Sequence, residues 1–336
     1  MQSSSVLILG ARGRFGSAAM RAFVQAGWQV HAQVRPGRAG PVSPGVQWIE
    51  AESGDTATLA HAARGAGVVV HGLNPVYTHK AWRAQVPGLT RAAIDISHEL
   101  GGTLMLPGNV YNFGDAMPAQ LHEDTPQRAD TVKGRLRIAC ERQIMEATRD
   151  GQMKAVVIRA GDFFGNGTGS WFDQMLAKDI TRGKLSYPGD LDVPTAWAYL
   201  PDLARSFVRV AAQRDRLEAF ELMHFAGHTL TGRDWAGALT DVAWEQGWLP
   251  LNGQLHITSM SWPLMRLVAL AVPTVAALCE MRYLWRTPHA LVNTRMKELI
   301  GDEPHTPLDD AVRDALGGLG LLDRPHAGHV FAMPSR

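Results

Sequence analysis

A glycine-rich loop near the N-terminus carries the clearest chemistry in this chain. It reads Gly10-Ala11-Arg12-Gly13-Arg14-Phe15-Gly16, between the apolar run Val6–Leu9 and a helical pattern from Ser17 to Ala26. In this spacing the first glycine allows a tight turn, the second lets the backbone approach a pyrophosphate, and the third permits close helix–strand packing. The helix N-terminus offers free N–H groups to the phosphates. We therefore predict that a dinucleotide binds at Gly10, Arg12, Gly13, Arg14, Phe15 and Gly16.

The end of the next expected strand, Gln29–Val34, indicates which dinucleotide binds. NAD-binding proteins place an acidic residue about 20 residues after the glycines, where it accepts hydrogen bonds from the ribose 2′-hydroxyl. This chain has no carboxylate there and reads Ala32-Gln33-Val34-Arg35. Arg35, with Arg12, could bind a 2′-phosphate through paired hydrogen bonds; the alternative is a solvated charge at a strand end. We expect NADP as the cofactor, with NAD as the alternative.

The apolar runs predict the scaffold that must position this loop. Further strands are expected at Val46–Ile49, Val68–His71, Thr103–Leu106 and Ala155–Ile158, with helices at Ala57–Arg64, Lys80–Leu100 and Thr131–Arg149. Continuous Val, Ile and Leu runs indicate strands that are covered on both faces, and hence a parallel sheet. The predicted fold is α/β, a doubly wound Rossmann sheet with a smaller, mostly helical C-terminal substrate domain. We expect residues 1–165 to bind NAD(P), and residues 166–336 to form the substrate domain, partly interleaved with the sheet.

The second half contributes weaker candidates. Helices are expected at 171–183, 234–247 and 308–320, and Leu267–Leu278 reads as a buried or pocket-lining helix. Asp162 lies just past a strand end, where ligands of open α/β sheets bind, although an Asp in a turn is an equal alternative. Trp171 and Trp197 could line a pocket for an apolar substrate, or could simply be core residues.

Composition excludes several classes of function. The chain has 336 residues, 46% of them hydrophobic, and a net charge of +1 without a long basic run, so no nucleic-acid partner is expected. Its two cysteines lack CxxC spacing, and its 13 histidines lack metal-binding spacing, so no metal site is predicted. The N-terminus lacks a signal-peptide pattern, and Leu267–Leu278 is too short to span a bilayer. We expect a cytoplasmic protein, with attachment to a membrane surface through Leu267–Leu278 as the less favoured alternative.

Further motifs follow in a characteristic order along the chain. Val110-Tyr111 is followed by Gly114, Arg159 by Gly165-Asn166-Gly167, and then comes Tyr199-Leu200-Pro201-Asp202-Leu203-Ala204. With the glycine loop, this order resembles the short-chain dehydrogenase/reductase superfamily, specifically its extended or atypical members similar to NAD-dependent epimerases and dehydratases. The resemblance spans almost the whole chain. It implies that Asp55 contacts adenine and that Leu73, Asn74 and Pro75 lie beside the cofactor ribose.

The departures from this superfamily concern catalysis. Active members use a Tyr-x-x-x-Lys pair on one helical face and a Ser or Thr after the fifth strand. Lys133 fits the lysine position, but Ala129 stands at the tyrosine position and Pro107 at the Ser/Thr position. By resemblance to isoflavone-reductase-like proteins, Lys133 would bind the cofactor ribose and supply or relay the proton, while Tyr111 and Asn109 polarise the substrate. The alternatives are a packing role for Tyr111 and a surface position for Lys133.

These observations predict an NAD(P)-dependent oxidoreductase of the atypical type. The expected reaction is the NADPH-dependent reduction of a carbonyl group or an activated double bond on an apolar small molecule. A nucleotide-sugar epimerase or dehydratase is one alternative, which the missing tyrosine and serine disfavour. A non-catalytic NAD(P) redox sensor is the other, which the missing groups favour. The expected partner is a small-molecule substrate, and the resemblance is compatible with a homodimer.

Overall fold

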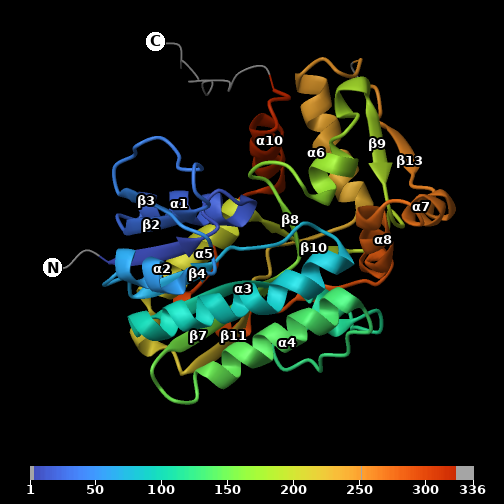
Figure 1. Cartoon of the computed structure of the whole chain (residues 1–336). Helices are drawn as coiled ribbons and strands as arrows, with labels where there is room; N and C mark the ends of the chain where they lie inside the picture. The colour runs from blue at the N-terminus through green and yellow to red at the C-terminus, as the bar shows by residue number, and fades with distance from the viewer. Residues whose placement is uncertain (1–3, 251, 323–336) are drawn as a thin grey trace, which may run out of the picture.

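The alternation of apolar runs and helical stretches forms a parallel sheet that is covered on both faces (Figure 1). The computed structural model describes residues 4–250 and 252–322, so residues 1–3 and 323–336 of the expected domains lie outside the described residues. The sheet has the strand order β11-β7-β5-β4-β1-β2-β3, and every neighbouring pair is parallel. Its strands are β1 (Ser5–Leu9), β2 (Gln29–Val34), β3 (Val46–Glu50), β4 (Val68–His71), β5 (Thr103–Asn109), β7 (Lys154–Ala160) and β11 (Phe220–His224).

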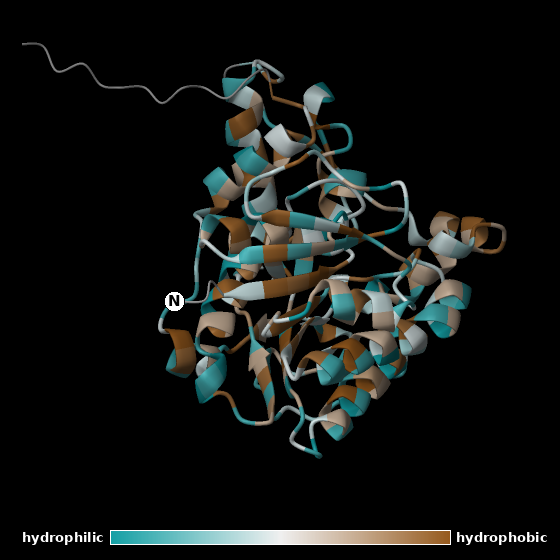
Figure 2. Cartoon of the chain, turned by 60° about the vertical axis from the view of Figure 1, so that its left-hand side comes forward, coloured by the Kyte–Doolittle hydropathy of each residue, from teal (hydrophilic) through white to brown (hydrophobic). Residues whose placement is uncertain are grey.

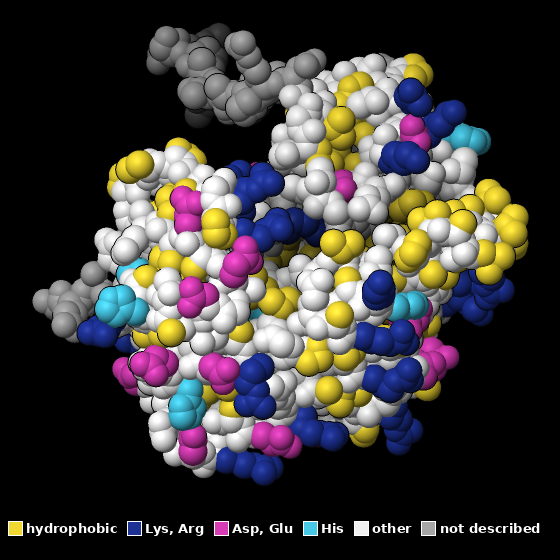
Figure 3. Space-filling model, viewed as in Figure 1, with side chains coloured by type: hydrophobic (Ala, Val, Ile, Leu, Met, Phe, Trp, Pro, Cys, Tyr) yellow, Lys and Arg dark blue, Asp and Glu magenta, His cyan; other side chains and the backbone are white. Residues whose placement is uncertain are grey.

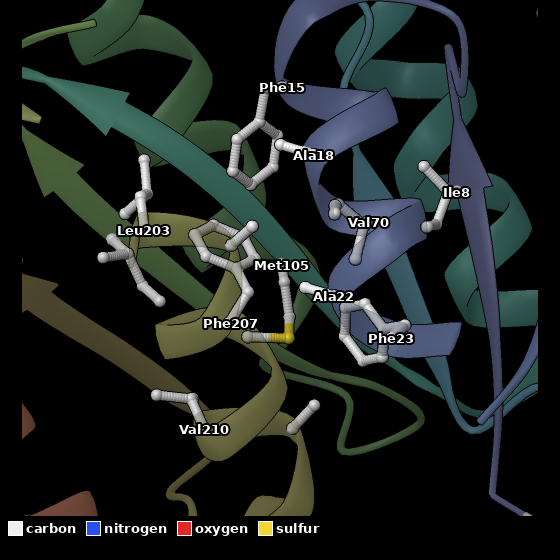
Figure 4. Close-up of a cluster of buried hydrophobic side chains, with 14 of the residues drawn as sticks. Ile8, Phe15, Ala18, Ala22, Phe23, Val70, Met105, Leu203, Phe207 and Val210 are labelled. Carbon is white, nitrogen blue, oxygen red and sulfur yellow. The ribbon is translucent and has the colours of Figure 1, made fainter. Parts of the chain in front are cut away.

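Helices α1 and α5 cover one face of this sheet, and α2, α3 and α4 cover the other. The helices of the chain are α1 (Arg14–Gln25), α2 (Thr56–Ala62), α3 (His79–Leu100), α4 (Val132–Ala147), α5 (Leu200–Ala212), α6 (Gly232–Glu245), α7 (Trp262–Ala269), α8 (Pro273–Glu280), α9 (Thr294–Ile300) and α10 (Leu308–Gly318). Alternate residues of each strand enter the two cores: Ile8 faces α1 and α5, whereas Leu7 faces the opposite helices. Figure 4 shows Ile8, Phe23, Met105 and Phe207 within the first of these cores.

The predicted Rossmann fold is confirmed, down to the bounds of β2 and β4. The strands are predominantly hydrophobic and run between more polar helices, as the hydropathy colouring in Figure 2 shows. The strand order reverses between β1 and β4, and ligands of doubly wound sheets bind at the carboxyl ends of the strands at such a point. The glycine loop after β1 lies there.

The second half of the chain forms three small sheets and a second core. Strands β8 (Asp162–Phe164), β10 (Thr195–Tyr199) and β12 (His228–Leu230) form one sheet, β9 (Lys184–Tyr187) pairs with β13 (His256–Ser259), and β6 (Gln120–Leu121) pairs with β14 (Ala290–Leu291). A core rich in Trp, Phe and Tyr fills the space between these sheets, α6 and α10. Strand β11 returns to the large sheet, so the two halves share that sheet.

Two helix predictions in this half are wrong. The segment 171–183 forms a π-helical turn, Phe172–Leu176, and a 3-10 turn, Ile180–Arg182, because Ala177 N–H bonds to the Phe172 carbonyl five residues back and the regular winding ends there. The expected helix Leu267–Leu278 is two helices, α7 and α8, because Pro273 cannot continue the first one. Helix α7 is also not buried: Leu264 and Leu267 are 58% and 64% exposed. Within the described residues, no helix is long and apolar enough to span a bilayer.

Candidate active site

The glycine loop forms a cradle for an anion. Gly10 has a φ of +74°, which an L side chain rarely adopts, and a Cβ on Gly16 would overlap the Gly10 carbonyl oxygen. Helix α1 begins directly after Gly13, whose position provides no side chain to cap it. The first N–H groups of α1 therefore remain available for a phosphate, together with the positive end of the helix dipole. The residues present fit a dinucleotide.

The end of β2 presents arginines beside this cradle. Buried Gln33 accepts a hydrogen bond from Gly10 N–H at 2.8 Å and donates one to the Ala51 carbonyl at 2.8 Å, which fixes the loop against β2. Arg35 and Arg38 are exposed beyond the strand, and Arg12 donates to the Arg38 carbonyl at 3.2 Å. Figure 3 shows basic side chains gathered in the hollow between the N-terminal part of the chain and its C-terminal helices.

An acidic residue also lies near this end of β2. Glu50 accepts a hydrogen bond from the Gly37 backbone N–H. Its position in β3 is next to Val34 of β2. Glu52, which is exposed, follows two residues later. Arginines and carboxylates thus both lie near the end of β2, and Arg12 and Arg35 are the groups there that could bind a phosphate.

Three other residues expected to bind the cofactor are Asp55, Leu73 and Phe15, and they lie in three different environments. Asp55 is exposed and caps α2, where it accepts a hydrogen bond from Thr58 N–H at 3.2 Å. Leu73 packs over Gly10, next to the cradle. The Phe15 ring packs edge-on against Phe207 in the core, with 4.7 Å between ring centroids, so only its backbone N–H can face a phosphate.

A cavity of about 380 Å³ opens beyond the carboxyl ends of β4, β5 and β7. Its walls combine aromatic and aliphatic side chains with many polar and charged ones, so it can contact both apolar and polar parts of a small molecule. It is lined by Arg14, Asn74, Pro75, Tyr77, Trp82, Asn109, Tyr111, Arg137, Gly161, Asp162, Phe163, Gly169, Ser170, Trp171, Gln174, Thr274 and Leu278. The structure thus brings together seven predicted residues from distant parts of the chain: Arg14, Asn74, Pro75, Asn109, Tyr111, Asp162 and Trp171.

Two tyrosine hydroxyls meet in this cavity. The Tyr111 and Tyr77 hydroxyl oxygens are 3.3 Å apart. Burial raises the pKa of Tyr77, and the nearby Tyr111 raises it further. Burial likewise raises the pKa of Tyr111, with a contribution from the Asp162 carboxyl. Asn109 fixes this corner, because its side-chain oxygen accepts a hydrogen bond from Tyr111 N–H at 3.1 Å. Both hydroxyls therefore stay protonated at neutral pH and can donate hydrogen bonds.

Asp162 is the group in the cavity that can exchange a proton near neutral pH. Burial raises the pKa of its carboxyl from 3.8 to about 7. Asp162 begins β8 immediately after Gly161, where a Cβ would overlap the Ala196 carbonyl. Only glycine lets the chain pass this close to β10, so the local sequence holds the carboxyl at the end of the sheet. A carboxyl with this pKa is half protonated at neutral pH, as a general acid requires.

Arg137 is a cationic group in the cavity that the sequence motifs did not indicate. It lies on α4 one helical turn after Lys133, and its guanidinium stacks over the Trp82 ring at 5.0 Å from the centroid. Its Nε is buried without a hydrogen-bond partner among the described residues. Its spacing of one helical turn from Lys133 is a sequence signal that could have indicated Arg137 as a site residue. The superfamily motif, however, specifies only the lysine.

Lys133 was expected to supply or relay the proton to the substrate, but it is not among the residues that line this cavity. Its side chain is fully buried, and its ammonium donates to the Ala277 carbonyl at 3.3 Å and lies 3.6 Å from the Glu280 carboxylate. It also lies 4.3 Å from the centre of the Tyr77 ring. Burial lowers the pKa of Lys133 to about 8, against the effect of Glu280. Because α8 supplies both of its partners, Lys133 ties α4 to α8 and is neither on the surface nor facing the cavity.

The remaining expected residues divide between cavity and core. Trp171 lines the cavity and packs edge-on against Trp285. Trp197 is only 1% exposed and packs among Phe164, Trp235 and Trp285, so the expectation that it faces a substrate is wrong. Arg14 reaches the cavity rim, where its guanidinium donates to the Gly165 carbonyl at 3.0 Å.

A model of the NAD-dependent epimerase/dehydratase family matches residues 6–224. The chain belongs to this family. No curated protein matches it closely enough to serve as a relative. Among solved structures, UDP-glucose 4-epimerase from Brucella ovis in complex with NAD is similar, with 16% identity, a TM-score of 0.72, and coverage of 96% of this chain and 100% of that one.

Two further structures give the same result. The enzyme WbmH from Bordetella bronchiseptica in complex with NAD⁺ has 16% identity, a TM-score of 0.70 and coverage of 95% and 99%. UDP-glucose 4-epimerase from Thermotoga maritima with UDP-glucose has 13% identity, a TM-score of 0.70 and coverage of 94% and 98%. At this identity the likeness shows the fold. Family membership supports the expected class of NAD(P)-dependent enzyme, without selecting NADP or reduction.

Proposed function

We propose that this epimerase/dehydratase-family protein is an NADPH-dependent reductase of a carbonyl group or an activated double bond on a mostly apolar small molecule. The observation that carries the proposal is the position of Asp162, a carboxyl with a pKa of about 7, in a cavity at the carboxyl end of the sheet. Reduction requires a proton donor there, and the usual tyrosine position holds Ala129.

The polar residues of the cavity have two roles, which are to bind the substrate oxygen and to donate a proton. Tyr77 and Tyr111 keep their protons because burial raises the pKa of each, so they hold the substrate oxygen by hydrogen bonds. As negative charge develops on the substrate, Asp162 donates its proton to the substrate. Water that enters the open cavity then reprotonates the Asp162 carboxylate. A positioned acid of this kind contributes about 10²–10⁴-fold to a rate.

The cofactor would bind at the glycine loop, whose Arg14 also lines the cavity. When bound, NADPH supplies the hydride, which with the proton of Asp162 completes the addition of two hydrogens to the substrate bond. The glycine cradle would bind the pyrophosphate, and Arg12 and Arg35 would bind the 2′-phosphate. Arg137 and Asn109, which line the cavity beside Tyr111, are the candidates for orienting the cofactor's reactive end in place of Lys133.

The walls of the cavity favour an apolar substrate. Trp82, Phe163, Trp171 and Leu278 present hydrocarbon and aromatic surface to the space in front of Asp162. A ligand that covers these side chains removes apolar surface from water, while its one reactive polar bond meets the two tyrosine hydroxyls.

The test is NADPH oxidation, followed by absorbance, with a panel of apolar aldehydes, ketones and conjugated enones. We expect turnover that decreases as the pH rises through about 7, because the protonated carboxyl is the active form. Asp162→Asn should lower kcat by about 10²-fold or more and remove this pH dependence. Asp241→Asn, at an exposed position of α6, is the matched control and should leave both unchanged.

Two other results would contradict the proposal. Interconversion of nucleotide sugars with tightly held NAD, and no reduction of the panel, would identify an epimerase that acts without the usual tyrosine. Dinucleotide binding without any turnover, in every pairing of cofactor and panel member, would identify a sensor.

A further inference from the structure

Helix α7 and the turn after it form an apolar projection on the surface. Leu264 and Leu267 on α7 are 58% and 64% exposed, and Leu270 and Val272 in the turn are 84% and 40% exposed. Exposed large hydrophobic residues are otherwise scattered over the described surface. Figure 3 shows these side chains as a continuous hydrophobic area over α7, at the right edge of the molecule. Exposed apolar surface of this kind marks an interaction site.

A cluster of arginines accompanies this projection. Arg266 and Arg286 are exposed, and Arg282 stacks over the Trp262 ring at 5.0 Å from its centroid. Burial, and then repulsion by Arg286 and Arg266, lowers the pKa of Arg282, so each of these two arginines lies near Arg282. Among residues 4–250 and 252–322, none of the three forms an ion pair. Figure 3 shows basic side chains directly beneath the hydrophobic area.

We propose that the α7–α8 hairpin docks the protein on the surface of a membrane that contains anionic lipids. The leucines of α7 and of the following turn enter the boundary between headgroups and acyl chains, and Arg266, Arg282 and Arg286 bind the lipid phosphates. Short apolar helices flanked by basic residues lie in this interface without crossing the bilayer. Attachment to a membrane surface was the less favoured alternative at the level of the sequence, where Leu267–Leu278 reads as a buried or pocket-lining helix.

The charges favour a membrane over a second copy of the chain. A two-fold contact through the leucines brings each patch against itself, so the arginine clusters of the two copies approach one another. Like charges at an interface oppose association. An anionic lipid surface instead compensates all three arginines while it covers the leucines.

The docking surface adjoins the candidate active site. Helix α8 follows the apolar turn, and its Thr274 and Leu278 line the cavity. A docked hairpin therefore places the cavity next to the hydrocarbon boundary, where an apolar substrate would be concentrated. This consequence rests on the proposed function, whereas the docking itself does not.

The experiment is flotation of the full chain with vesicles, without cofactor or substrate, so its result is independent of the reaction. One vesicle preparation is phosphatidylcholine alone, and the other contains added phosphatidylglycerol. We expect flotation with the anionic vesicles that decreases at high salt. Replacing Leu264, Leu267 and Leu270 together with Gln should lower the partition about 100-fold or more. Because these side chains are exposed, this variant should fold normally, which urea unfolding checks.

Two further variants identify the cause. Arg266→Gln with Arg286→Gln should lower the partition to anionic vesicles by a factor of about 20, and change the partition to neutral vesicles little. Val42→Gln, at a site 98% exposed between β2 and β3, is the matched control and should float like the wild type. No flotation of the wild type, or equal flotation of the triple leucine variant, would overturn the proposal. Concentration-dependent dimers that the triple variant abolishes, without flotation, would show that a second copy covers the patch.

Discussion

The raised pKa of Asp162 has a consequence for stability that can be measured without any substrate. Its carboxyl has a pKa of about 7 in the folded protein, against 3.8 for an aspartate in water. Between these values the folded state binds more protons than the unfolded state, so the free energy of unfolding must decrease as the pH rises from about 4 to 7. The full shift corresponds to about 4 kcal/mol, of which about 2.5 kcal/mol is lost between pH 5 and pH 8.

Asp162→Asn removes this proton equilibrium and keeps the shape of the side chain. We therefore compare the free energy of unfolding of the variant with that of the wild type at each pH. The difference, variant minus wild type, should be about 2.5 kcal/mol larger at pH 8 than at pH 5. Urea unfolding of the cofactor-free protein at several pH values measures the difference, and Asp241→Asn serves as the control for a solvated carboxyl. A difference between wild type and Asp162→Asn that stays constant over this range would refute the raised pKa, and with it the role of Asp162 as the proton donor.

Three further predictions follow from the contacts. Gly16→Ala should abolish dinucleotide binding in calorimetry, because the added Cβ overlaps the Gly10 carbonyl oxygen; undiminished binding would place the cofactor elsewhere. Arg35→Ala should weaken NADPH binding by about tenfold or more and leave NADH binding unchanged, and an equal loss for both would disprove contact with a 2′-phosphate. Glu280→Ala should lower the free energy of unfolding by about 3 kcal/mol because Lys133 is left buried without its carboxylate. Adding Lys133→Met should recover part of this loss, and no recovery would show that the ion pair is not the cause.

The sequence predicts the fold well because strand and helix periods are local properties. Continuous apolar runs such as Val68–His71 have no other stable position than the centre of a covered sheet. The glycine loop is equally local, since its spacing follows from one tight turn into one helix. The same approach was wrong for α7, because an apolar run shows that side chains prefer to be covered and does not show what covers them.

The candidate site was predictable only in part, because tertiary contacts decide which way a side chain points. Asp162, Tyr111 and Asn109 follow strand ends, and the topology alone brings such residues together. Lys133 matches the superfamily motif, but its charge partner is Glu280, which lies far along the chain in α8. The sequence has no local signal for that contact. Arg137 lies one helical turn after Lys133, but the sequence does not show that Arg137 lines the cavity instead of Lys133.

The proposed reduction requires that this chain bind NADPH. Calorimetric titration of the cofactor-free protein with NADPH, NADP⁺, NADH and NAD⁺ measures this binding. We expect clear preference for the two phosphorylated dinucleotides, with similar affinity for NADPH and NADP⁺. Preferential binding of NAD⁺ and NADH over NADP⁺ and NADPH would contradict this prediction. The arginines at the end of β2 would then not bind a 2′-phosphate.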